Sequence, residues 1–96
     1  MEIKQQALAG TLESSDVQIM ISPNRQGLLI HLESDVKKQF GKQIEATVRE
    51  ILSSYEIENA ELQIVDKGAL DLVIRARMIT VIERAINSKE LNLEVL

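Results

Sequence analysis

Apolar and polar residues alternate through two short stretches in the first third of the chain, 17–22 and 28–33. Such alternation places one set of side chains on a single face, as in a strand with one buried face. Residues 23–27 between them read Pro-Asn-Arg-Gln-Gly. This is turn chemistry, because Pro fixes one φ angle while Asn and Gly tolerate a positive φ. Two strands joined by a short loop predict a β-hairpin.

Apolar residues recur at intervals of three and four through residues 36–55, which predicts a helix with one apolar face. The residues of this face are Val36, Phe40, Ile44, Val48, Ile51, Leu52 and Tyr55. Ser34 or Asp35 is expected to cap the helix by accepting a bond from a free backbone amide. Gly41 lies inside it and should cost about 1 kcal/mol relative to alanine. The length of the apolar face outweighs that cost.

Alternation returns at residues 60–64 and predicts a third strand, which Asp66-Lys67-Gly68 ends. Residues 69–87 fit a helix, although their first part also alternates like a strand; the length and the later spacing favour the helix. Residues 91–95 form a possible short extra strand. We therefore predict an α+β fold in the order β-β-α-β-α. A small sheet, the N-terminal hairpin plus a third strand, is covered on one face by two helices.

In residues 1–16 the apolar positions follow neither the spacing of a strand nor that of a helix, and the segment is rich in small and polar residues. We interpret 1–16 as an exposed N-terminal segment and 17–96 as a single domain, because 96 residues leave no room for a second core. Apolar residues make up 45% of the chain, which is too many for a disordered protein. Phe40 and Tyr55 are its only aromatic residues. The core is therefore expected to be almost wholly aliphatic.

The charge balance excludes several classes of function. Fifteen acidic residues stand against eleven basic ones, a net charge of −4, whereas nucleic-acid binding normally needs clustered positive charge and stacking aromatic residues. The absence of cysteine excludes disulfides and thiolate metal sites. No apolar run approaches the roughly 20 residues of a membrane helix, and the polar N-terminus does not resemble a signal peptide. We expect no nucleic-acid or membrane partner and a cytoplasmic location.

Residues that could catalyse a reaction or bind a metal are sparse. His31 is the only histidine, and alternation places it on the outward face of its strand, with no metal-ligand set nearby in the sequence. The acidic residues are scattered, and the four glycines are isolated from one another. We predict no catalytic residue and no metal site, and hence that the chain is not an enzyme by itself.

Basic residues cluster on or beside the second predicted helix, where Arg75, Arg77 and Arg84 follow Lys67. One interpretation is a solvated helix face that keeps the domain in solution. The other is a basic spot that binds a phosphate-bearing group or an acidic partner. The residues alone do not separate these two interpretations.

Two serines, Ser14 and Ser15, lie in the predicted flexible and exposed segment just before the first strand. A hydroxyl in such a place is accessible to a modifying enzyme, and a group attached to it could swing. The alternative is a turn hydroxyl that bonds its own backbone. Residue chemistry leaves both alternatives open.

Several separated motifs resemble one family. Residues 9–17, Ala-Gly-Thr-Leu-Glu-Ser-Ser-Asp-Val, are similar to the attachment segment of the citrate lyase acyl carrier proteins, the gamma chains of that complex. Residues 36–41, Val-Lys-Lys-Gln-Phe-Gly, resemble the first helix of the family. Residues 66–71, Asp-Lys-Gly-Ala-Leu-Asp, and 74–77, Ile-Arg-Ala-Arg, resemble its second signature. The motifs occur in the family's order and span most of the chain.

The resemblance implies that Ser14 carries 2'-(5''-phosphoribosyl)-3'-dephospho-CoA through a phosphodiester bond. Ser15, which stands where some members have glycine, is the fallback site. The terminal thiol of the group would hold acetyl and citryl thioesters. The implied partners are the alpha subunit (the acyl transferase), the beta subunit (the citryl lyase) and a prosthetic-group transferase. Two alternatives remain: the acyl carrier subunit of malonate decarboxylase, which uses the same group, and an unmodified α+β interaction module.

Overall fold

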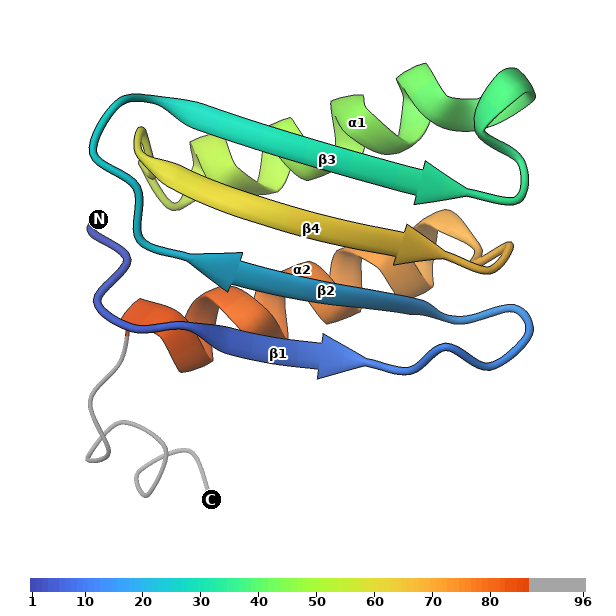
Figure 1. Ribbon diagram of the computed structural model, residues 1–96, viewed down its shortest axis with the longest axis horizontal. Helices are drawn as coiled ribbons and strands as arrows, with labels where there is room; N and C mark the ends of the chain where they lie inside the picture. The colour runs from blue at the N-terminus through green and yellow to red at the C-terminus, as the bar shows by residue number, and fades with distance from the viewer. Residues whose placement is uncertain (87–96) are drawn as a thin grey trace.

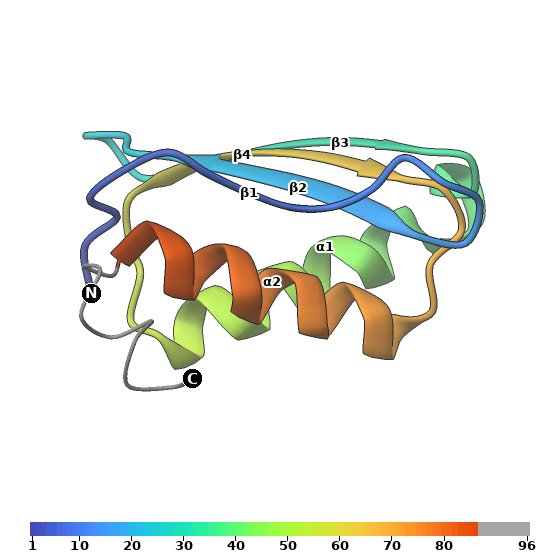
Figure 2. The same ribbon diagram turned by 90° about the horizontal axis from the view of Figure 1, so that it is seen from below.

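The computed structural model describes residues 1–86 as a four-stranded sheet with two helices against one of its faces (Figure 1, Figure 2). The elements in chain order are β1 (Ala7–Gly10), β2 (Val17–Ser22), β3 (Leu28–Ser34), α1 (Lys37–Ser54), β4 (Ala60–Asp66) and α2 (Asp71–Ile86). The predicted α+β class is confirmed, as is the covering of one face by two helices. The possible extra strand at 91–95 lies outside the described residues.

The strand order is β1-β2-β4-β3, so β4 lies between the two strands that were expected to pair with each other. Strand β4 is antiparallel to β2 and parallel to β3. Residues 17–22 and 28–33 are thus strands, as predicted, but they do not form a hairpin. The loop 23–27 passes over two strand spacings, about 10 Å, which five extended residues span easily. Helix α1 then returns the chain so that β4 enters the gap parallel to β3.

The N-terminal segment contains a strand that the sequence pattern does not predict. Strand β1 pairs antiparallel with β2, and Ile3 and Ala9 are buried. Because β1 is a short Ala-Leu-Ala-Gly stretch, it has little of the β-branched or aromatic content that marks a strand. Residues 1–16 are therefore not exposed throughout as predicted. The exposed stretch next to β2 is limited to residues 12–15.

The core lies between the sheet and the helices and is aliphatic, as expected. Its largest buried side chains come from alternating positions of β2 and β4 and from one face of each helix: Val17, Ile19, Ile21, Leu62, Ile64, Val48, Leu52, Ile74, Met78, Val81 and Ile82. The helix predicted over 69–87 is confirmed from Asp71 to Ile86, the last described residue. Phe40 departs from the predicted apolar face, because 47% of its surface stays exposed. Within residues 1–86, neither helix is long and apolar enough to cross a membrane.

The start of α1 differs from the predicted capping. Val36 occupies the N-cap position, and no side chain bonds a free amide of the first turn. Ser34 instead accepts a bond from the Val36 amide (3.1 Å) and donates its hydroxyl to the buried Asp66 carboxylate (2.8 Å). The serine thus stabilises the connection between β3 and α1, and in the first turn the Gln39 amide donates to the Val36 carbonyl at 3.1 Å.

Three connections gather at one end of the sheet. The β1–β2 loop, the β3–α1 connection and the β4–α2 connection lie together, because β1, β3 and β4 end where β2 begins (Figure 1). The N-terminus, the β2–β3 loop and the α1–β4 loop lie at the opposite end. Ser14 belongs to the first group, which we call the serine end of the molecule.

Two glycines should respond in opposite ways to alanine. Gly10 has φ +90°, and an added Cβ would lie 1.8 Å from the Val17 carbonyl oxygen, so Gly10→Ala should lower the free energy of unfolding by at least about 2 kcal/mol. Gly41 lies within α1, and its added Cβ would meet only the Lys37 side chain at 3.0 Å. Because lysine can rotate away, Gly41→Ala should raise the free energy by about 0.5–1 kcal/mol. Urea unfolding measures both changes, and a wild-type midpoint for Gly10→Ala would contradict the close approach of Gly10 to the Val17 carbonyl.

Candidate functional site

Ser14 and Ser15 form the centre of a β-turn in the β1–β2 loop. The Asp16 amide donates to the Glu13 carbonyl at 3.1 Å, which closes the turn around the two exposed serines. Among the side-chain hydrogen bonds of residues 1–86, none involves the Ser14 hydroxyl. The alternative of a hydroxyl bonded to its own backbone therefore finds no support at Ser14. Its oxygen is exposed to solvent.

Ser15 differs from Ser14 in its backbone. It has φ 67°, in the left-handed region that favours glycine, whereas Ser14 has a negative φ. The Ser15 amide donates to the Lys67 carbonyl at 2.7 Å, which attaches the turn to the β4–α2 connection. The two adjacent serines are therefore not equivalent: Ser15 shapes the turn, and Ser14 stands at its first corner.

Asp16 holds the base of the turn. Its carboxylate accepts bonds from the Thr11 hydroxyl (2.6 Å) and the Val17 amide (2.7 Å). The Arg77 guanidinium donates to both carboxylate oxygens, at 3.1 Å and 2.8 Å. The bonds from Arg77, and next those from Thr11 and Val17, hold the pKa of Asp16 far below its usual range. A charged and largely buried carboxylate thus joins the loop to α2, 61 residues further along the chain.

A second carboxylate joins the other two connections of the serine end. Asp66, at the end of β4, is 1% exposed and accepts bonds from the Ala69 amide (2.9 Å) and the Ser34 hydroxyl (2.8 Å). The Lys67 amide donates to the Asp16 carbonyl at 2.8 Å, so the pairing of β2 with β4 continues into the loops. The serine turn therefore stands on a hydrogen-bonded base, and it differs from the flexible segment that the sequence predicted.

Of the clustered arginines, only Arg77 reaches the serine loop. Arg75 donates to Glu50 at 3.1 Å and to Asp71 at 2.7 Å, so it joins α2 to α1. Arg84 donates to a backbone carbonyl of β1 at 2.6 Å. These arginines hold elements together, which is neither of the two interpretations that the sequence left open.

His31 lies on the open face of the sheet, as the alternation predicts. Its ring Nε2 is 3.1 Å from a carboxylate oxygen of Glu61 on the neighbouring strand β4, and half of its side chain is exposed. Between Met1 and Ile86, no three His, Asp or Glu side chains come close enough to hold a metal ion. His31 forms a surface pair with one neighbour.

Sequence reasoning missed the residues that build the turn. Thr11 and Asp16 flank the two serines at a separation of five, a hydroxyl and a carboxylate that could have been read as a loop-closing pair. Gly10 is also required for the shape of the loop, because a side chain at this position would collide with the Val17 carbonyl. The role of Arg77 had no local signal, since its partner lies far away in the sequence.

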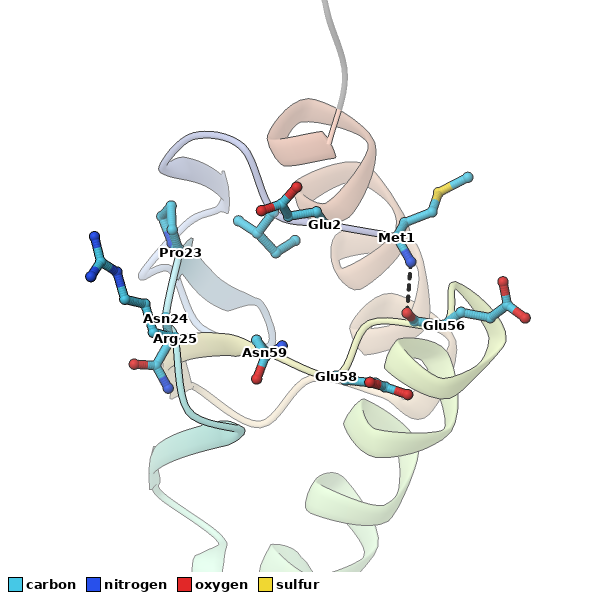
Figure 3. Close-up of a pocket in the computed structure, with 9 residues that line it drawn as sticks. Met1, Glu2, Pro23, Asn24, Arg25, Glu56, Glu58 and Asn59 are labelled. Atoms are coloured by element: carbon cyan, nitrogen blue, oxygen red, sulfur yellow. Dashed lines mark hydrogen bonds between the residues drawn. The ribbon is translucent and has the colours of Figure 1, made fainter.

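Hollows lie at both ends of the molecule. An apolar groove of about 300 Å³ lies at the serine end, between the first turns of α1 and α2. It is lined by Val36, Phe40, Gln43, Ile44, Gly68, Ala69, Leu70, Asp71 and Ile74. A broader hollow of about 670 Å³ lies at the other end and is rimmed by Glu2, Arg25, Glu56 and Glu58. There the Met1 amino group donates to the Glu56 carbonyl at 2.6 Å (Figure 3).

Comparison with known proteins relates the chain to acyl carrier subunits. Residues 4–85 match the model of the malonate decarboxylase delta subunit family of acyl carrier proteins. The citrate lyase acyl carrier protein of Lactococcus lactis subsp. lactis is 73% identical over 96 residues, covering all of both chains. That of Leuconostoc citreum is 55% identical over 97 residues, also covering all of both chains. That of Leuconostoc mesenteroides subsp. cremoris is 57% identical over 88 residues, 92% of this chain and 91% of the relative.

The fold is also found in a solved structure. A chain in the crystal structure of a Pseudomonas malonate decarboxylase hetero-tetramer in complex with malonate superimposes with a TM-score of 0.74. The match covers 88% of this chain and 92% of that chain, at 21% sequence identity. At that identity the likeness shows a shared fold.

The Asp16 contacts predict a specific dependence of stability on pH. Because the pKa of Asp16 is lowered on folding, its stabilising effect is complete above the ordinary Asp pKa, near 4, and is lost as the pH falls below it. We expect Asp16→Asn to lower the free energy of unfolding by about 1–3 kcal/mol at pH 7, and by progressively less toward pH 2.

Urea unfolding of both proteins between pH 7 and pH 2 measures this difference. Glu45→Gln is a matched control, because Glu45 pairs with Arg49 on an exposed helix face, where such pairs contribute at most about 0.5 kcal/mol. If Asp16→Asn were no more destabilising than Glu45→Gln at pH 7, the carboxylate would not hold the loop.

Proposed function

Because the chain belongs to the family of citrate lyase acyl carrier proteins, we propose that it is the carrier subunit of a citrate lyase complex and bears its prosthetic group on Ser14. The observation that carries this proposal is the full-length 73% identity to a protein of that name. The exposed Ser14 hydroxyl, free of protein partners among residues 1–86 and set on a hydrogen-bonded turn, supports the site.

The proposed group is 2'-(5''-phosphoribosyl)-3'-dephospho-CoA, joined to the Ser14 oxygen through a phosphodiester. The residues present fit such an attachment, because Ser14 is exposed to solvent and modification of its hydroxyl breaks no hydrogen bond of the turn. When bound, the group supplies a terminal thiol that carries acyl groups as thioesters. The phosphodiester adds one negative charge at this end of the molecule.

The chain itself contributes position. The prosthetic group would form a flexible arm on Ser14. The Asp16–Arg77 contacts and the Ser15–Lys67 bond hold the point where this arm is attached at a defined place on the surface. A tether of this kind keeps the acyl group at high effective concentration near successive active sites, without release into solution. We infer that the bond-making residues belong to the alpha and beta subunits of the complex and that a transferase loads Ser14.

Ser14 is favoured over Ser15 by the backbone of the turn. Both hydroxyls are exposed, but Ser15 has the strained φ of 67° and its amide is bonded to Lys67. A glycine at position 15 would relieve that strain and would leave Ser14 as the one hydroxyl of the turn. The shape of the turn thus depends on position 15, while only a hydroxyl at position 14 serves for attachment.

The malonate decarboxylase carrier is the second candidate. The matching family model bears that name, and the similar fold occurs in a malonate decarboxylase. The solved chain is 21% identical, however, whereas the relatives named for citrate lyase reach 73% over the whole chain. We therefore favour citrate lyase.

Intact mass of the chain purified from its native host, with the lyase complex active, tests the proposal. We expect an adduct of the mass of the phosphoribosyl-dephospho-CoA group, and peptide mapping should place it on Ser14. Ser14→Ala should abolish loading. Ser15→Gly is the matched control: it removes the neighbouring hydroxyl, suits the positive φ, and should leave loading complete.

Two outcomes would contradict the assignment. Only unmodified chain in an active complex would refute the carrier role and favour an interaction module. Loading of Ser14→Ala together with its loss in Ser15→Gly would move the site by one residue. Equal urea midpoints of the Ser14→Ala variant and the wild type would show that a loss of loading is not a loss of fold.

A further inference from the structure

Large apolar side chains are exposed at the serine end. Phe40 and Leu70, at the rim of the apolar groove, are 47% and 74% exposed, and Leu12 in the serine loop is 54% exposed. The floor of the groove is formed by the buried Ile44 and Ile74. Phe40 is the one phenylalanine of the chain, and it lies on the face of α1 that should be buried. An apolar groove with an exposed aromatic residue at its rim is typical of a surface that a partner covers.

Lysines without an ion pair lie at the serine end in a way that stability does not explain, whereas the one charged residue of the groove lining, Asp71, is paired with Arg75. The first turn of α1 contains Lys37 and Lys38 and no acidic residue. Cations at a helix N-terminus oppose the helix dipole and therefore destabilise the helix slightly. Lys67 precedes the groove residue Gly68 on the other side. Among residues 1–86, none of these three lysines forms an ion pair, although the whole chain has a net charge of −4.

The groove adjoins the root of the proposed arm. Its lining includes Gly68. The preceding residue, Lys67, accepts the bond from the Ser15 amide with its carbonyl. Both first turns that form the groove start from the same end of the sheet as the serine loop (Figure 1, Figure 2). A protein that receives the arm must therefore approach the end of the molecule where the groove opens.

We propose that this groove, with Phe40 and Leu70 at its rim and with Lys37, Lys38 and Lys67 at the same end of the molecule, is the docking surface for the subunit that receives the arm. The inference rests on the proposed carrier function. The occupant is a protein surface with an apolar side chain that enters the groove and carboxylates that face the lysines. The apolar contact supplies affinity, and the charges supply orientation and the rate of association.

A second copy of this chain fits the groove poorly. The carboxylates of Glu2, Glu56 and Glu58 rim the hollow at the opposite end of the molecule. Docking of that end into the groove of a neighbour would be head-to-tail, and it would produce rings or open chains rather than a two-fold dimer. Binding of a different protein in the groove avoids such head-to-tail assembly.

Binding of the carrier to purified citrate lyase alpha and beta subunits, measured by calorimetry at 50 and 300 mM salt, tests the docking surface. Phe40→Ser should weaken binding to at least one subunit about tenfold or more. Leu70→Ser, at a more exposed position, gives a second variant that keeps the fold. The double variant Lys37→Gln with Lys38→Gln should weaken binding about three- to tenfold at 50 mM salt and reduce its salt dependence.

Matched controls remove the same groups elsewhere. Leu29→Ser changes an apolar residue that is also 47% exposed, on the open face of the sheet. Lys4→Gln with Arg25→Gln removes two charges away from the serine end. Both controls should bind within twofold of the wild type. Groove variants that bind like these controls would overturn the proposal, as would an effect confined to self-association of the carrier.

Each variant is also measured on the Ser14→Ala background, which carries no arm. If Phe40→Ser weakens binding equally there, the subunit contacts the groove directly, as proposed. If the effect disappears, the groove holds the arm, and the proposal is wrong. The binding measurement on the Ser14→Ala background needs no loading of the carrier. Its result is therefore independent of the test of the proposed function, which fails only if the native chain lacks the adduct.

Discussion

Strand β4 lies at the centre of the sheet, and its pairing on both sides decides where each loop of the molecule lies. Its residues Leu62 and Ile64 are buried and pair with Ile21 and Ile19 of β2, while its other edge pairs with β3. Because β4 is parallel to β3 and antiparallel to β2, the ends of β3 and β4 meet the start of β2. The serine loop, the start of α1 and the start of α2 therefore share one end of the sheet.

Two carboxylates turn that shared end into a defined surface. Asp66 bonds the connections that lead into α1 and α2, and Asp16 bonds the serine loop to Arg77 of α2. Charged groups that are removed from water are costly unless each is paired. Here each carboxylate has hydrogen-bond donors on both of its oxygens. A group attached to Ser14, as proposed, would project from a fixed base, and its reach would be set by its own length.

Most large apolar residues of the molecule are buried in its core, but a few are exposed at the serine end. An aliphatic core without aromatic residues fills the space between sheet and helices, while Phe40 and Leu70 remain at the surface of the serine end, where the first turn of α1 has two lysines and no acidic residue. A domain of 96 residues buries a modest share of its surface and has little stability to spare. Exposed apolar groups and cations at a helix N-terminus are therefore informative, because the isolated fold gains nothing from them. A carrier that works only inside a complex accounts for both.

The sequence by itself determined the elements whose signal is local. Alternation identified β2, β3 and β4, spacing identified both helices, and the motif around Ser14 indicated a carrier, because each depends on residues close together in the chain. It did not determine the partners of β2 and β3, since a short loop between strands is compatible with a strand inserted between them. It also missed β1 and the Asp16–Arg77 pair. The short Ala-Leu-Ala-Gly strand gains its order from pairing with β2, and Arg77 meets Asp16 only when α2 packs beneath the sheet. Long-range pairing was thus decided by the tertiary structure, which places two exposed serines on a hydrogen-bonded turn where the sequence predicted a flexible segment.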